Sequence, residues 1–238
     1  MYHDSHHRQT HSPTNVDPGL PEPAKLNAMN TQPQTLPYLL TTEHGMPMSQ
    51  LVIKGSGLRF TQTIADGLRA GGIWLVMQDK CGTVAMAKGD IMMLAHIDAV
   101  DWLSDRQIVL NLHIQAEGIL HHDAAYASTT RLQGETIALW SQATLGSPAS
   151  PLPALDTHDV LVTRLLQSWQ AQGRSLPDDH QAFPMTYPPH WICWRWLEIL
   201  PISLATKQRL LKHPTPLLCM RYIKKIIRHS DLSVQPLR

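Results

Sequence analysis

The chain has 238 residues, of which 43% are hydrophobic and 16% charged, and its formal net charge at pH 7 is +1. These values are typical of an ordinary globular protein that is long enough to bury a sizeable core. No run approaches the roughly 18 apolar residues of a membrane span, and the N-terminus lacks the apolar region of a secretory signal. We therefore expect a cytoplasmic protein that does not contact a membrane.

Three cysteines, Cys81, Cys193 and Cys219, form no close-spaced pair. An odd number in a chain expected to be cytosolic predicts free, mostly buried thiols rather than a disulfide framework. Buried apolar packing is the favoured role for Cys193 and Cys219 over that of a nucleophile.

The charge is unevenly distributed. Residues 195–238 contain nine Lys and Arg against Glu198 and Asp231, which gives this segment +7 and leaves −6 for the other 194 residues. Such asymmetry indicates either a surface for an acidic partner or the solvated faces of terminal helices, and we favour the second interpretation.

Residues 1–35 are polar and Pro-rich and show no apolar periodicity, so we predict a disordered tail. Its four histidines could attract a transition metal. A flexible, spaced set without cysteine or defined geometry is weak evidence for a metal site, and we predict neither a metal nor a cofactor.

From Leu36 onward the pattern predicts short strands and one helix. The helix is expected at 61–69, with Phe60, Ile64 and Leu68 on its inner face and Gly71-Gly72 at its end. Ile108, Leu110, Leu112 and Ile114 alternate with polar residues in the clearest strand, which we expect to end at Gly118. The other strands are predicted at 36–40, 48–54, 73–78, 82–86, 90–103 and 131–140.

Beyond a Pro-rich linker at 141–156, the hydrophobic period changes to that of helices. Helices are predicted at 157–172, 191–200 and 204–213, the third with Ser203 as its N-cap, and a last helix is expected after Thr215-Pro216. On this last helix an apolar stripe opposes a basic stripe of Arg221, Lys224, Lys225 and Arg228. The sequence thus predicts an α+β protein with a β-rich subdomain at 36–140, an α-helical subdomain at 157–230 and a tail at 231–238.

Several short patterns follow one another along the chain. They are Leu36-Pro37 in the first strand, Arg59 at the first helix, Gly82-Thr83-Val84, Gly118, the segment Leu197–Ile202 and the segment Lys207–Leu211 followed by Pro214. In their order, over roughly residues 36–230, the chain resembles the N-terminal, substrate-binding domain family of Lon proteases. The resemblance implies a PUA-like pseudo-barrel followed by a helical bundle, and a module that recognises polypeptide.

The chain departs from the family pattern in a few places, such as Gly45-Met46-Pro47 between the first two strands, where the family commonly has Pro-Gly. It also contains no Walker A motif, and no peptidase domain with a Ser–Lys dyad follows. We therefore expect a free-standing, non-catalytic recognition domain.

Potential metal ligands form two clusters, His121-His122-Asp123 and Asp178-Asp179-His180. Neighbouring strand residues point to opposite faces, so His121 and His122 do not readily converge on one metal, and the second cluster lies in a predicted loop. Neither is expected to be a metal site.

Partner binding is instead assigned to two groups of residues, Trp191, Trp194 and Trp196 in one short helix and the basic stripe Arg221, Lys224, Lys225 and Arg228. Not all three tryptophans can face inward, so at least one is expected at the interface between the subdomains or exposed, where it would dock apolar chain. Polypeptide binding is the favoured function, and nucleic-acid binding through the basic helix is the alternative. A minimal hydrolase is a third, weaker possibility.

Overall fold

The computed structural model describes residues 33–103, 105–121, 130–137, 140, 153–172 and 186–233. Every described residue lies in one compact unit, residues 31–238. The predicted tail and its four histidines therefore lie outside the described residues up to position 32. Its last two residues, Gln34 and Thr35, belong to the first strand.

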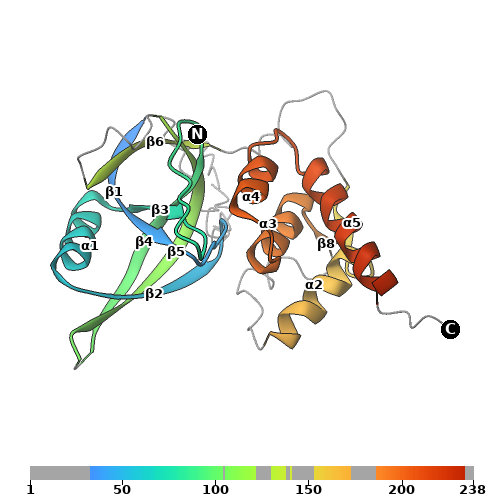
Figure 1. The fold of residues 1–238 in the computed structure, drawn as a ribbon, viewed down its shortest axis with the longest axis horizontal. Helices are drawn as coiled ribbons and strands as arrows, with labels where there is room; N and C mark the ends of the chain where they lie inside the picture. Colours follow the sequence, from blue (N-terminus) through green and yellow to red (C-terminus); the bar gives the residue numbers. More distant parts are fainter. Residues whose placement is uncertain are drawn as a thin grey trace, which may run out of the picture. The chain divides into compact units, whose positions relative to one another are not determined.

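Six strands form one mixed sheet with the order β2-β5-β4-β3-β1-β6 (Figure 1). β1 runs parallel to β3 and antiparallel to β6, and β6 also pairs with β5, so the sheet closes on itself. The strands are β1 (Gln34–Thr41), β2 (Gln50–Ser56), β3 (Ile73–Met77), β4 (Ile91–Trp102), β5 (Gln107–Leu120) and β6 (Arg131–Ile137).

The alternation predicted for β5 is confirmed, because its four apolar side chains are all buried (Ile108, Leu110, Leu112 and Ile114). The prediction that Gly118 ends this strand is wrong, since β5 continues to Leu120. Gly118 is needed for close packing: a Cβ atom there would lie 2.5 Å from the indole ring of Trp74. The glycine at this position is therefore explained by the close approach of the Trp74 ring and not by a turn.

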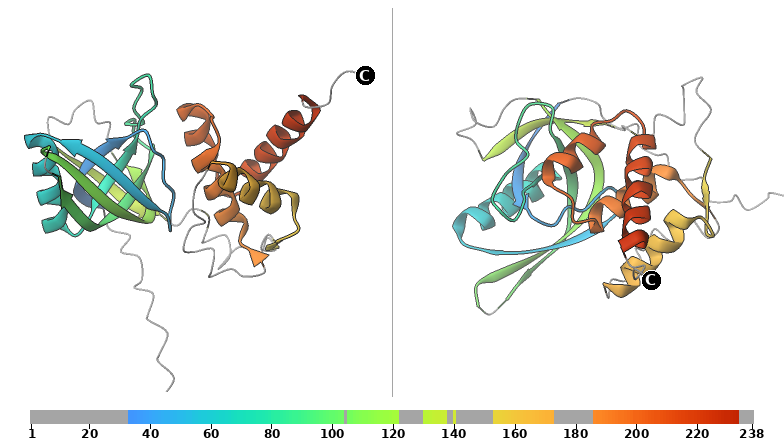
Figure 2. Two further views of the ribbon diagram at one scale, coloured as in Figure 1. Left: turned by 90° about the horizontal axis from the view of Figure 1, so that it is seen from below. Right: turned by 45° about the vertical axis from the view of Figure 1, so that its right-hand side comes forward.

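α1 (Leu58–Ala70) begins three residues before the predicted start and packs against β1, β2 and β3 (Figure 2). Ile64 is buried as predicted, but Leu68 is 55% exposed and does not belong to the inner face. The inner position is taken by Gly67, where a Cβ atom would lie 3.1 Å from Ile97. The helix ends as expected at Gly71, whose φ of 76° is in the left-handed region.

The predicted strand at 82–86 is replaced by a loop between β3 and β4, in which only an isolated bridge joins Gln78 and Val84. The Asp79 carboxylate accepts hydrogen bonds from the backbone N–H groups of Cys81 (2.9 Å) and Thr83 (2.7 Å). These bonds hold a tight turn instead of an extended strand.

Four helices follow the sheet in the described part of the chain: α2 (Val160–Ala171), α3 (Pro189–Ile199), α4 (Leu204–Leu211) and α5 (Leu217–Ser233). Ser203 caps α4 as predicted, since its hydroxyl accepts a hydrogen bond from the Thr206 N–H. Two short strands, β7 (Leu155–Asp156) and β8 (Thr186–Tyr187), pair beside the helices. None of the helices described is long and apolar enough to cross a membrane.

The largest hydrophobic core is shared by the sheet and the helices. It includes Ile97 and Leu110 from the strands, and Leu165, Trp191 and Ile223 from the helices. A smaller cluster surrounds Trp74 inside the sheet. The α+β class is confirmed, and the sheet and helices are joined by apolar packing as well as by the chain.

Candidate functional site

A buried ion pair within α3 forms hydrogen bonds to the turn between β1 and β2. The Arg195 side chain, fully buried, donates a hydrogen bond to the Pro47 carbonyl and lies 3.2 Å from the Glu198 carboxylate. The same Glu198 oxygen accepts a hydrogen bond of 2.8 Å from the Met46 N–H. A charged pair removed from water needs such additional hydrogen bonds, so this contact fixes the position of α3 against the sheet.

A second buried contact joins α3 to β5. Glu117 accepts a hydrogen bond of 2.8 Å from the Trp194 indole N–H, and Trp140 stacks on Trp194 with ring centroids 6.3 Å apart. Burial raises the pKa of the Glu117 carboxyl to about 7, although the Trp194 hydrogen bond favours the ionised form.

The side chain of Gln208 joins α4 to the start of β4. Its Oε1 accepts from the Ile91 N–H and its Nε2 donates to the Ile91 carbonyl, both at 2.8 Å. The amide thus pairs with the strand as a neighbouring backbone would. One turn further on, Lys212 Nζ lies 2.6 Å from Asp90 Oδ1.

The inner face of α4 also carries a buried lysine. Lys207 is nearly fully buried, and burial lowers its pKa to about 8, opposed by the nearby Glu198 carboxylate. His44, whose ring nitrogen bonds the Gln78 carbonyl at 2.8 Å, has its pKa lowered by burial and by the charge of Lys207. The polar groups beneath α4 therefore belong to the interior rather than to a solvent-accessible site.

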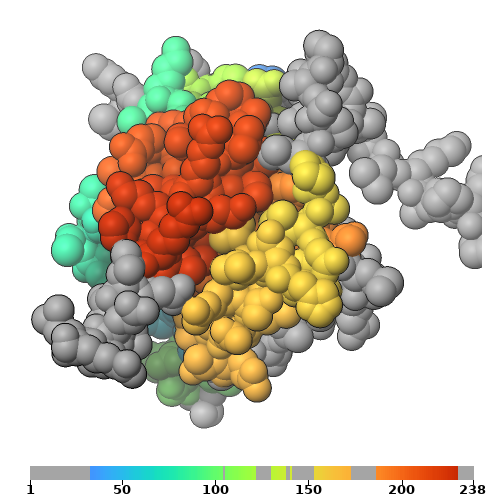
Figure 3. All heavy atoms as spheres, turned by 90° about the vertical axis from the view of Figure 1, so that its right-hand side faces the viewer, coloured from blue at the N-terminus to red at the C-terminus, as the bar shows by residue number. Residues whose placement is uncertain are grey.

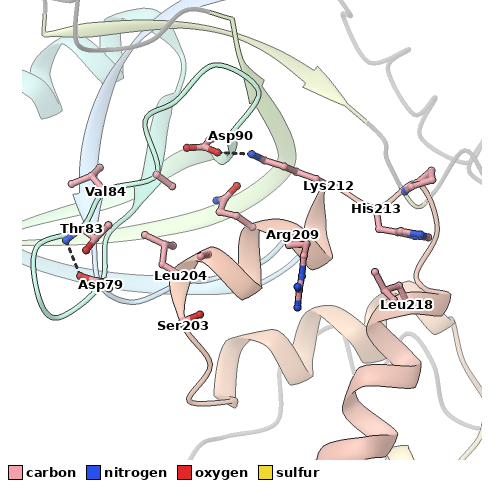
Figure 4. A pocket seen from close by; sticks show the side chains of 14 residues that line it. Asp79, Thr83, Val84, Asp90, Ser203, Leu204, Arg209, Lys212, His213 and Leu218 are labelled. Carbon is pink, nitrogen blue, oxygen red and sulfur yellow. Dashed lines mark hydrogen bonds and ion pairs between the residues drawn. The ribbon is translucent and has the colours of Figure 1, made fainter.

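These contacts leave a cleft of about 810 Å³ between the loop that joins β3 to β4 and the helices α4 and α5 (Figure 4). The loop wall comprises Asp79, Thr83, Val84, Ala85 and Asp90. The opposite wall comprises Ser203, Leu204, Ala205, Gln208, Arg209, Lys212, His213, Pro214 and Leu218.

The lining of the cleft combines apolar side chains with charged ones. In Figure 4, Asp90 and Lys212 point toward each other, whereas Arg209 extends away from Asp90. Arg209 is exposed and makes no ion pair or hydrogen bond with another residue that the structure describes. The cleft therefore offers apolar side chains for contact, together with one cation, Arg209, that has no acidic partner among the described residues.

One of the comparisons with known proteins identifies the fold. No protein-family model matches the chain, and no curated protein sequence matches it either. Among solved structures, the crystal structure of a Lon N-terminal domain protein from Xanthomonas campestris matches with a TM-score of 0.53 and 16% identity, covering 85% of this chain and 99% of that one. The fold is that of a Lon N-terminal domain. The N-terminal domain of Mycobacterium avium complex Lon protease also aligns, with a TM-score of 0.44 and 12% identity over 79% of this chain and 95% of that one.

In this Lon N-terminal domain fold the three tryptophans of α3 are interior residues, and direct docking of a partner by them stays a prediction. Trp191, Trp194 and Trp196 are 1%, 6% and 5% exposed. Trp194 lies between the sheet and the helices, and the Trp196 indole donates to the Leu161 carbonyl at 3.1 Å. A short helix can bury three indoles here because α3 is covered on several sides, by α2, α5 and the sheet.

The other predicted site residues are spread over separate surfaces. The basic side chains Arg221, Lys224, Lys225 and Arg228 are exposed on α5. His121 contacts Glu135 at 3.2 Å, whereas His122, Asp123 and the 178–180 cluster lie outside the described residues. Across the described ranges, no three His, Cys, Asp or Glu side chains are placed to hold one metal ion. Cys193 and Cys219 are buried and Cys81 is exposed, all as free thiols.

Sequence reasoning missed the polar residues that build the site. Arg195 stands in an apolar helix, at a position where a polar side chain must find a buried partner, and this pattern was the available signal. Gln208 carried no such signal, because it lies between Lys207 and Arg209 in α4. Asp90 and Arg209 carried no signal at all, because exposed charged residues are common in loops and helices.

Proposed function

We propose that this protein is a non-catalytic module that recognises polypeptide, and that the cleft beside α4 receives an extended apolar segment. The cleft is the observation that carries the proposal. Its volume of about 810 Å³ lies within the range of ligand-binding clefts and suits a few side chains of a bound segment. The likeness to Lon substrate-binding domains supports the same function.

The chemistry of the lining supports binding without catalysis. In the cleft lining, the hydroxyl that most resembles a catalytic nucleophile belongs to Ser203, and it contacts the Thr206 hydroxyl at 3.0 Å. The His213 ring contacts the Thr215 carbonyl at 3.0 Å. Each group is thus engaged within its own turn rather than with the other, unlike an activated nucleophile and its base. A PUA-like barrel, a helical bundle and a cytoplasmic location are parts of the same proposal.

The test compares two exposed leucines. Leu218 lines the cleft and is 37% exposed, whereas Leu58 at the start of α1 is 82% exposed and does not line it. We expect Leu218→Ser to weaken binding of a labelled, reduced and alkylated unfolded protein about fivefold, measured by fluorescence anisotropy. Leu58→Ser serves as the matched control and should bind as the wild type does.

A bulky residue in the cleft gives a second, independent variant. Ala205 is exposed on α4 and lines the cleft, so Ala205→Trp fills the space without altering the core. Weaker binding in both cleft variants, with unchanged circular dichroism and thermal midpoint, is the expected result. Equal affinity for the wild type, Ala205→Trp and Leu218→Ser would overturn the assignment of the cleft.

Nucleic-acid binding is the competing function, and the same assay addresses it. Binding driven by phosphate contacts weakens steeply with salt, whereas apolar capture of a polypeptide does not. A labelled single-stranded RNA is therefore titrated at two salt concentrations beside the polypeptide. Salt-sensitive RNA binding without polypeptide binding would replace the proposal.

A further inference from the structure

The face of α5 that lines the cleft continues as a row of basic side chains. Leu218 lines the cleft, and Arg221 and Lys225 follow it by three and seven residues. Residues at this spacing lie on one face of a helix, so the two cations extend the wall of the cleft along α5. Arg228 follows along the helix, about one turn beyond Lys225.

The buried face of α5 shows that this row of basic side chains points away from the core. Cys219, Ile223 and Ile227 are buried in the shared core, which leaves Arg221 and Lys225 on the outer side. Both are exposed, and neither pairs with another residue within the described part of the chain. Figure 3 shows the outer surfaces of α4 and α5 lying beside each other.

The charge on the helical side of the cleft is of one sign. From Ile199 to His229 the chain contains seven Lys and Arg and no Asp or Glu. Lys207 is buried and Lys212 is paired with Asp90, which leaves five exposed cations that have no acidic partner among the described residues: Arg209, Arg221, Lys224, Lys225 and Arg228. A surface of this kind attracts a negatively charged ligand and repels a basic one.

We infer that the cleft and the α5 row together bind an extended polypeptide segment in which an apolar anchor adjoins acidic residues. This inference rests on the proposed function and adds the chemistry of its preferred ligand. From Leu218 to Lys225 the helix rises about 10 Å, which is about three residues of extended chain. Arg228 adds about 5 Å, so the acidic residues lie within about five positions of the anchor.

The cleft itself favours an acidic polypeptide over a nucleic acid. Asp79 and Asp90 line its loop wall, so a polyanion with a phosphate at every position meets two carboxylates there. Among the residues that the structure describes, no Phe, Tyr or Trp lines the cleft to stack on bases, although stacking supplies much of the affinity for single strands. An apolar anchor, by contrast, fits beside Leu204, Ala205 and Leu218.

The experiment compares three labelled peptides that share an apolar anchor of Leu, Val and Leu and differ in the four residues that follow, which are all Glu, all Gln or all Lys. Fluorescence anisotropy with the full chain measures each affinity at low and high salt. We expect the Glu peptide to bind about tenfold more tightly than the Gln peptide at low salt, with the difference shrinking at high salt.

A charge-matched pair of variants locates the effect. Arg221→Glu/Lys225→Glu should abolish the preference for the Glu peptide and leave the Gln peptide unchanged. Lys54→Glu/Arg59→Glu alters two exposed cations of β2 and α1 by the same charge and should keep the preference.

Each outcome separates the inference from the proposed function. Equal binding of the Glu and Gln peptides overturns the inference and leaves the proposed function in place. If none of the three peptides binds, both the inference and the proposed function are overturned. Binding of a single-stranded RNA that requires Arg221 and Lys225, with no preference among peptides, overturns the inference and assigns the row to nucleic acid.

Discussion

The Glu117 carboxylate of β5 and the Trp194 indole of α3 share a hydrogen bond of 2.8 Å in the interior, where the sheet meets the helices. Glu117 is 3% exposed, and its side chain forms no hydrogen bond or ion pair with any other residue that the structure describes. A carboxylate held by one neutral donor is costly to ionise, and for this reason the pKa of Glu117 is raised to about 7.

This raised pKa predicts a pH-dependent stability. The ordinary value is 4.5, so between pH 4.5 and about 7 the folded protein retains a proton that the unfolded chain has lost. The free energy of unfolding should therefore fall as the pH rises through this window and then level off. Glu117→Gln removes this contribution and should be more stable than the wild type at pH 8 by about 3 kcal/mol.

Chemical denaturation of both proteins from pH 5 to pH 8 measures this difference. Trp194→Phe is the matched control, because it removes the donor and should move the end of the window to a higher pH. Parallel stability profiles for the wild type and Glu117→Gln would show that this carboxyl does not titrate in the window.

The buried pair of Arg195 and Glu198 should be sensitive to the loss of one partner. Glu198→Gln leaves the fully buried guanidinium of Arg195 without its counter-charge, and we expect a loss of about 3 kcal/mol in the free energy of unfolding. The double variant Arg195→Met/Glu198→Gln removes the charge as well and should recover part of the loss. An additive effect of the two substitutions in denaturant titrations would contradict this coupling.

Gln208 should be hard to replace because it satisfies both backbone groups of Ile91. Gln208→Leu has similar size but leaves a buried N–H and a buried carbonyl unpaired, which we expect to cost about 2 to 4 kcal/mol. Gln208→Glu keeps the acceptor but places a carboxylate against the Ile91 carbonyl. Hydrogen exchange at the Ile91 amide reports the contact directly, and unchanged protection in Gln208→Leu would refute its role.

Gly118 should tolerate no side chain. In Gly118→Ala the new methyl would lie 2.5 Å from the Trp74 ring and 3.3 Å from the Glu135 carbonyl, so strand β5 or the indole must shift. We expect a loss of about 1 to 3 kcal/mol. Gly118→Ala/Trp74→Leu makes room for the methyl, and its stability should equal that of Trp74→Leu alone if the clash is the cause.

Features that depend on neighbours in the chain were predictable. The alternation in β5, the N-cap of Ser203 and the two stripes of α5 each follow from the period of a strand or helix and from local hydrogen bonding. The order of short motifs was enough to indicate the Lon N-terminal domain fold. Predictions were wrong where a residue distant in the chain determines which side chain fits at a position. The Trp74 ring requires a glycine at position 118, and Ile97 packs closely against Gly67 in α1.

The sequence by itself determined the α+β class, the order of most elements and the basic outer face of α5, because these are consequences of hydrophobic periodicity. Only the tertiary structure decided that the three tryptophans of α3 are buried and that a cleft opens beside α4. Gln208 meets Ile91 across 117 residues of chain, and Lys212 meets Asp90 across 122. Such contacts depend on how the sheet and helices pack in space, and no local pattern in the sequence encodes them.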